Sequence, residues 1–183
     1  MSPILVRPVR EQLEHDRVIR LLQVKLKRKH DVVTNIGEDQ TVPVRIGQVQ
    51  IFPDLVLTSV DRGKKLMGTV EVETAESVNH LEAMAQWAHL GRARAPFHLY
   101  VPSGSVDTAR RLCTDLQIPV AEVWAYHWLG DQMRFTLVQR SGRSWAWVDL
   151  TAFGATGTRV DAPLVLDDAA QTLAWIDART HAG

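Results

Sequence analysis

Residues 53–58 read Pro-Asp-Leu-Val-Leu-Thr, and residues 68–74 read Gly-Thr-Val-Glu-Val-Glu-Thr. Both stretches have the composition of short β-strands, and the segment between them carries turn-forming residues near Arg62 and Gly63. The pattern predicts a β-hairpin centred on that turn. In this register Asp54 lies opposite Glu71, and facing residues of paired strands are about 5 Å apart.

The second strand of this hairpin places acids in the middle of apolar residues. Side chains alternate along a strand, so Glu71 and Glu73 face one side while Val70 and Val72 face the other. Together with Asp54, these acids would crowd one end of a sheet. Like charges at such separations raise each other's pKa unless a cation lies between them. Carboxylate oxygens suit a hard cation, so the pattern indicates a site for Mg²⁺ or Mn²⁺.

The composition is that of an ordinary folded protein, which narrows the function classes. The chain has 183 residues, of which 45% are hydrophobic and 23% charged, enough for one domain with a sizeable core. The formal net charge is +0, so any affinity for nucleic acid must come from uneven placement of charge. The single cysteine, Cys113, excludes an internal disulfide and a cysteine zinc cluster, and its neighbours predict a core residue. We expect a cytoplasmic protein without a membrane span, because no apolar run approaches the roughly 20 residues a span needs.

Helices and strands alternate around the hairpin. The first helix is expected from Pro8 to about Arg28, with an apolar face formed by Leu13, Val18, Ile19, Leu21, Leu22 and Leu26. The second is expected over residues 76–90, with Thr74 as N-cap and Gly91 as C-cap. Its predicted apolar face consists of Val78, Leu81, Ala85, Ala88 and Leu90. The other expected elements are strands near 32–33, 42–46, 96–102, 121–128, 133–139 and 145–150, and helices near 105–116 and 166–180.

Basic residues gather at the end of the first helix and after the second. They are Lys25, Lys27, Arg28 and Lys29 in the first group, and Arg92 and Arg94 in the second. Cations at the carboxyl end of a helix are favoured by its dipole, which is one explanation of the first group. The other is a patch that contacts phosphates at the mouth of a cleft.

Tryptophans and histidines allow weaker inferences. Trp124, Trp128, Trp145 and Trp147 alternate along expected strands, which favours packing over base stacking. The histidines show no metalloprotease or deaminase spacing. The chain also lacks a phosphate-binding loop, a dinucleotide fingerprint and a nucleophile elbow.

The order of elements and the motif Pro53-Asp54 followed by Glu71-Val72-Glu73 resemble the PD-(D/E)XK nuclease superfamily over residues 8–128. The resemblance implies an α/β protein with the restriction-endonuclease-like fold. In that fold a mixed central sheet is flanked by helices in an α-β-β-β-α-β core. We expect residues 1–128 to form this core, and residues 129–183 to add strands and a short closing helix packed on the same domain.

The resemblance also implies roles for individual residues. Family members typically hydrolyse DNA with Mg²⁺, so Asp54 and Glu71 would be metal ligands and catalytic residues. An acid of the first helix, Glu14 or Glu11, would complete the metal site. In some branches a glutamine lies in the helix after the motif, a place that Gln86 would occupy as a catalytic residue.

The chain departs from the family pattern at Glu73, where lysine is usual. A few restriction enzymes of this fold carry glutamate there and remain active, so Glu73 stays a catalytic candidate that binds a second ion or orients the attacking water. Many members act as dimers, which makes a homodimer an expectation by analogy.

Two functions follow from these observations. The first is a metal-dependent nuclease that acts on DNA through Asp54, Glu71, Glu73 and Gln86. In this nuclease the nucleic acid would be contacted by the two basic groups: Lys25, Lys27, Arg28 and Lys29, and Arg92 and Arg94. The alternative is a catalytically inactive module of the same fold that binds nucleic acid or a protein partner.

Overall fold

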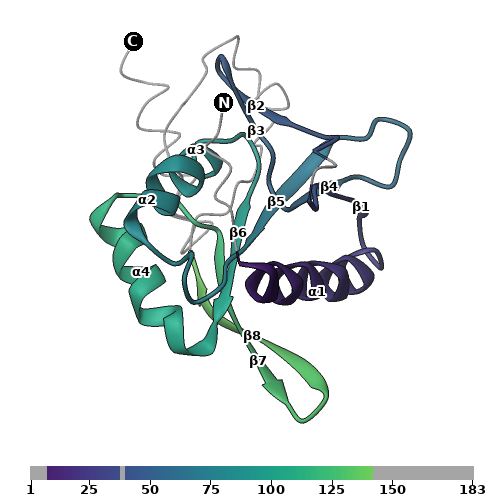
Figure 1. The fold of residues 1–183 in the computed structure, drawn as a ribbon. Coiled ribbons are helices and arrows are strands. Elements are labelled where there is room, and N and C mark those ends of the chain that lie inside the picture. The colour runs from purple at the N-terminus through teal and green to yellow at the C-terminus, as the bar shows by residue number, and fades with distance from the viewer. Residues whose placement is uncertain (1–7, 38–39, 142–183) are drawn as a thin grey trace, which may run out of the picture. The chain divides into compact units, whose positions relative to one another are not determined.

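The computed structural model describes residues 8–37 and 40–141. They form a mixed α/β structure in which helices cover both faces of a six-stranded sheet (Figure 1). The sheet order is β1-β4-β5-β6-β7-β8, antiparallel from β1 to β5, parallel from β5 to β7 and antiparallel at β8. The strands are β1 (Asp31–Thr34), β4 (Leu55–Thr58), β5 (Leu66–Val72), β6 (Phe97–Pro102), β7 (Glu122–Leu129) and β8 (Gln132–Arg140). The expected α/β class is confirmed.

A separate two-stranded ribbon and the connecting helices complete the described fold. The ribbon consists of β2 (Val44–Ile46) and β3 (Val49–Ile51), which lie between β1 and β4 in the chain. The helices are α1 (Val9–Leu26), α2 (His80–Glu82), the π-helical turn η1 (Ala83–Trp87), α3 (Ala88–Leu90), the 3-10 turn η2 (Ser103–Ser105) and α4 (Val106–Asp115). No helix in the described residues is both long and apolar enough to cross a membrane.

Helix α1 forms where the sequence predicts it, but it buries a different set of side chains. Val18, Ile19 and Leu22 are buried as expected, whereas Leu13 is 65% exposed and Leu21 is also exposed. His15 takes the inward position that we expected for Leu13. His15 lies three residues before Val18, four before Ile19 and seven before Leu22. It therefore lies on the same face of the helix as these buried residues.

The second helix starts later than expected and is not a regular α-helix. It begins at His80, and the side chain of Asn79 caps it by accepting a hydrogen bond from the Glu82 N–H at 3.0 Å. The predicted cap, Thr74, is therefore wrong. The π-helical turn η1 changes which side chains point inward: Trp87 is fully buried, and Leu81 is 62% exposed.

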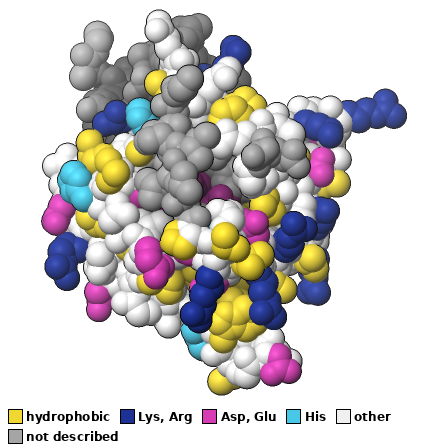
Figure 2. All heavy atoms as spheres, in the orientation of Figure 1, with side chains coloured by type: hydrophobic (Ala, Val, Ile, Leu, Met, Phe, Trp, Pro, Cys, Tyr) yellow, Lys and Arg dark blue, Asp and Glu magenta, His cyan; other side chains and the backbone are white. Residues whose placement is uncertain are grey.

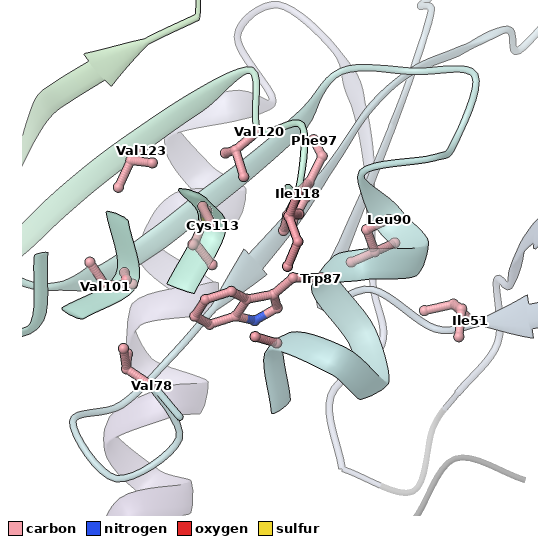
Figure 3. Close-up of a cluster of buried hydrophobic side chains, with 13 residues drawn as sticks. Ile51, Val78, Trp87, Leu90, Phe97, Val101, Cys113, Ile118, Val120 and Val123 are labelled. Carbon is pink, nitrogen blue, oxygen red and sulfur yellow. The ribbon is translucent and has the colours of Figure 1, made fainter. Parts of the chain in front are cut away.

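Trp87 lies at the centre of the core on the face of the sheet that α2, η1, α3 and α4 cover. Figure 3 shows its indole ring between Val78, Cys113 and Ile118. Cys113 is a core residue, as expected, and burial raises the pKa of its thiol to about 11. This core joins the irregular helical segment to β6, β7 and α4.

The opposite face of the sheet packs against α1. Val70 and Val72 of β5 belong to this second core, together with Tyr100 and Tyr126. The rings of Tyr100 and Trp124 are stacked with centroids 5.6 Å apart, so Trp124 packs as expected. Trp145 and Trp147 lie outside the described residues.

The described chain continues in the same sheet beyond the boundary predicted at residue 128. The strand expected near 133–139 is present as β8, which pairs with β7 along its length. The helix expected near 105–116 is present as α4. The strand expected at 145–150 and the helix expected at 166–180 lie outside the described residues.

Gly91 ends the second helix, as predicted, but the cause is close packing and not a left-handed conformation. Its φ is −61°, which any residue adopts. A Cβ at Gly91 would lie 2.9 Å from Pro119 Cδ and 3.0 Å from the Pro119 carbonyl oxygen. The loop before β7 therefore lies directly against the end of α3.

We predict that Gly91→Ala lowers the free energy of unfolding by about 1–3 kcal/mol, because the added methyl group overlaps Pro119. The matched control is Gly104→Ala, where nothing lies within 4 Å of the added Cβ. The control should be neutral or slightly stabilising, since alanine loses less backbone entropy on folding. Urea unfolding measures both, and equal stability of the two variants would contradict the role of Pro119.

Candidate functional site

The β4–β5 hairpin places Asp54 opposite Glu71, as the sequence predicts. Leu55 pairs with Val70, so the residue before β4 faces the next residue of β5. The Asp54 N–H donates to Glu71 Oε2 at 3.2 Å, and the Val72 N–H donates to Asp54 Oδ2 at 2.7 Å. These two bonds hold both carboxylates at the end of the hairpin.

His15 of α1 contacts the same carboxylate. Its Nε2 lies 3.2 Å from Asp54 Oδ2, and its Nδ1 lies 3.3 Å from Asp16 Oδ1. The side chain is only 5% exposed. The sequence analysis missed this residue, although a polar side chain in register with Val18 and Ile19 on the buried stripe was the available signal.

Glu73 lies in the core beside Trp87. The hydroxyl of Ser77 donates to Glu73 Oε2, and Trp87 Nε1 donates to Glu73 Oε1 at 2.6 Å. The backbone is held as well, because the Glu73 N–H donates to the Tyr100 carbonyl and the Tyr126 hydroxyl donates to the Glu73 carbonyl. Each carboxylate oxygen of Glu73 therefore accepts a hydrogen bond from the protein.

Glu82 is a further buried acid that the sequence analysis missed. It is 3% exposed and accepts a hydrogen bond from Gln86 Nε2. Its charge raises the pKa of both Glu71 and Glu73. Gln86, predicted as a site residue, is thus linked to the acids through Glu82. Regular helical periodicity did not place Glu82 on the inward face of this helix. The π-helical turn that follows changes the periodicity, and Glu82 is buried.

Burial and mutual repulsion shift the pKa values of the central acids. The pKa of Glu71 is raised, chiefly by burial and then by the charges of Asp54, Glu73 and Glu82. Burial also raises the pKa of Glu73 to about 8, although the bonds from Ser77 and Trp87 oppose the shift. Both shifts favour the protonated form of the carboxyl group.

Of the two acids of α1 that the resemblance implied, Glu14 and Glu11, the structure brings Glu11 near this region. Glu14 is exposed on α1. Glu11 Oε1, in contrast, accepts a hydrogen bond from Thr74 Oγ1 at 2.5 Å, one residue beyond Glu73. Glu11 and His15 of α1 thus make polar contacts with Thr74 and Asp54, in the segments that carry the acids.

The predicted basic residues are exposed but belong to two surfaces. Lys25, Lys27, Arg28 and Lys29 lie at the carboxyl end of α1, and Arg92 and Arg94 follow α3. Helix α1 covers one face of the sheet, and α3 covers the other (Figure 1). The two groups therefore lie on elements that cover opposite faces of the sheet.

The chemistry of the acids fits a hard divalent cation, but the part of the chain that the structure describes supplies few ligands for it. Within residues 8–37 and 40–141, no group of three or more His, Cys, Asp or Glu side chains is placed to hold a metal ion. Asp54 and Glu71 are the adjacent carboxylate pair. Mg²⁺ is commonly bound by one or two carboxylates, with waters and substrate phosphates as the other ligands, and such a pair is compatible with that mode.

No family model, curated protein or solved structure matches the chain. The function therefore has to be argued from the chemistry and geometry of the site, because a fold by itself does not determine a function.

We predict that Glu73→Gln gains stability relative to the wild type as pH rises from about 4.5 to about 8. The wild-type carboxyl holds its proton in the folded state up to about pH 8 but loses it near 4.5 when unfolded, so folding takes up a proton in this window. The contribution of Glu73 to the free energy of unfolding is therefore lost as pH rises toward about 8. Glutamine keeps the shape and has no proton to lose.

Thermal unfolding of both proteins across this pH range measures the difference. Ser77→Ala serves as the comparison, because it removes a hydrogen bond to Glu73 but leaves the titrating group in place. A difference between wild type and Glu73→Gln that does not change with pH would contradict the raised pKa of Glu73.

Proposed function

We propose that this protein is a metal-dependent nuclease that hydrolyses phosphodiester bonds, with DNA as the substrate and Mg²⁺ or Mn²⁺ as the cofactor. The observation that carries the proposal is the pair of carboxylates, Asp54 and Glu71, held together at the end of the β4–β5 hairpin. The element order from α1 to β6 supports a restriction-endonuclease-like core, with the β2–β3 ribbon as an insertion.

In this proposal Asp54 and Glu71 hold the cation. When bound, the cation neutralises the charge of the phosphodiester and lowers the pKa of a water molecule. Burial and neighbouring charges raise the pKa of Glu71, so binding of the cation competes with protonation of this side chain. His15 orients Asp54 through the contact at Oδ2, as residues behind metal ligands commonly do.

We assign Glu73 a positioning role in place of the water-orienting role expected from the motif. It is fully buried, and both of its oxygens accept hydrogen bonds from side chains. Its raised pKa favours the neutral form, which reduces the negative charge beside Glu71. Glu73 thereby ties β5 to the helical segment that carries Glu82 and Gln86.

One observation favours the alternative, a module of this fold without catalytic activity. Glu71 is 4% exposed, and Glu73 and Glu82 are also buried, so little of this acidic cluster faces solvent. A module of this kind would use the exposed basic residues of α1 to bind nucleic acid and would have no need for the cation.

We predict that Asp54→Asn lowers Mn²⁺-dependent cleavage of DNA by at least about 100-fold, because it removes the ligand charge. His15→Ala should lower it by about 10- to 100-fold, the usual effect of losing a group that orients a ligand. Cleavage of single- and double-stranded substrates is measured with and without the metal. Glu76→Gln is the matched control, since it removes the charge of an exposed acid between β5 and α2.

The inactive alternative gives a different result. It predicts that the wild type cleaves no substrate with either metal. Cleavage that persists undiminished in Asp54→Asn would equally contradict the assignment of Asp54.

We further predict that Mn²⁺ raises the thermal unfolding midpoint more at pH 8 than at pH 6. The ion has to displace a proton from Glu71, whose pKa is raised, so binding strengthens as pH increases. At 100 times the dissociation constant, binding stabilises the fold by about 2.7 kcal/mol. Glu71→Gln should reduce both the shift and its pH dependence, and an equal shift in this variant would contradict its role as ligand.

A further inference from the structure

A groove about 510 Å³ in volume lies between α1 and the β7–β8 hairpin, away from the buried acids. Its walls include Arg17, Leu21 and Lys25 of α1 and Trp128, Arg134 and Phe135 of the hairpin. Figure 2 shows lysine and arginine side chains interspersed with hydrophobic side chains on this side of the molecule. The volume is in the range of small-molecule and nucleotide sites.

The two walls follow directly from helix and strand periodicity. Arg17, Leu21 and Lys25 are spaced by four residues and form one ridge along α1. On the hairpin, Trp128 pairs with Met133 and Tyr126 pairs with Phe135, so these side chains share the face that looks toward α1. The ridge is therefore opposite a row of aromatic rings.

The cations of the ridge are held against these rings. The guanidinium of Arg17 lies 4.0 Å from the ring centroid of Trp128, and Lys25 Nζ lies 5.1 Å from that of Phe135. Such contacts are favourable and fix long side chains in place. Arg134 adds a third positive charge, and Asp131 is the one acid among the lining residues. The groove thus combines positive charge with aromatic surface although the chain as a whole has no net charge.

We propose that this groove binds single-stranded nucleic acid, with phosphates at Arg17 and Lys25 and a base against the part of Trp128 or Phe135 that these cations leave uncovered. This inference rests on the proposed function, for which it supplies the path of the substrate strand. The phosphates of a strand match the cations of the ridge, and its bases match the aromatic rings of the same groove. A duplex keeps the faces of its bases stacked and could use only the charges. Helix α1 connects the groove to the acids, since His15 contacts Asp54 from the same helix.

The test is equilibrium binding of a fluorescent oligodeoxythymidylate, measured by anisotropy in EDTA so that no cleavage occurs. We expect Arg17→Ala/Lys25→Ala to weaken binding at least about 10-fold. It should also reduce the slope of log K against log salt by about 1.4, which is about 0.7 for each lost phosphate contact. The control double variant Arg62→Ala/Arg111→Ala removes the same charge at exposed positions outside the groove and should bind like the wild type.

A second pair of variants tests the aromatic surface. Trp128→Leu should weaken binding about 10-fold, whereas Trp128→Phe keeps an aromatic face and should bind within about 3-fold of the wild type. Thermal unfolding verifies that both variants are folded. Duplex DNA and heparin, a polyanion without bases, are the competitors, and both should compete less well than single-stranded DNA.

Three outcomes would overturn the inference. They are unchanged binding by the groove variants, tighter binding of duplex than of single strands, and equal competition by heparin, which would indicate a site for polyanions in general. A failure of the proposed nuclease function gives results different from a failure of the groove. Absence of metal-dependent cleavage with intact groove binding would refute the nuclease, and cleavage with unchanged groove variants would refute the groove alone.

Discussion

The fold depends on one strand, β5, that is buried on both faces although one of them carries acids. Val70 and Val72 pack against α1, which is what an interior strand requires. Glu71 and Glu73 are buried on the other face, where a carboxylate without hydrogen bonds would be strongly unfavourable. Glu73 is accommodated by Ser77 and Trp87, and Glu71 by the backbone N–H of Asp54. Both buried carboxyl groups therefore have hydrogen-bond donors beside them.

The π-helical turn carries one of the hydrogen-bond donors to Glu73. It directs Trp87 into the core, with its ring N–H toward Glu73 and its carbon atoms among apolar side chains (Figure 3). Glu82, whose charge raises the pKa of Glu71, directly precedes this turn in the chain. Irregular turns of this kind are frequent at functional sites, where they move one side chain out of the regular period. Here the irregularity links the acids to Gln86.

Helix α1 serves two regions through different faces. Its buried stripe carries His15, which contacts Asp54, and its exposed ridge carries Arg17 and Lys25, which lie over aromatic rings of the β7–β8 hairpin. A change that moved α1 would therefore alter the acidic site and the groove together. This coupling is geometric, because both sets of side chains project from one rigid element.

The sequence by itself determined the α/β class, the β4–β5 hairpin, its register and the opposition of Asp54 and Glu71. These features depend on interactions between near neighbours: alternation of side chains, turn residues and short-range pairing. It did not determine which polar side chains enter the core. His15 replaced Leu13, Asn79 replaced Thr74 as cap, and Glu82 joined the acids. Only the tertiary structure decided these, because the inward face of a helix depends on the partners that lie opposite it, and those partners come from distant parts of the chain.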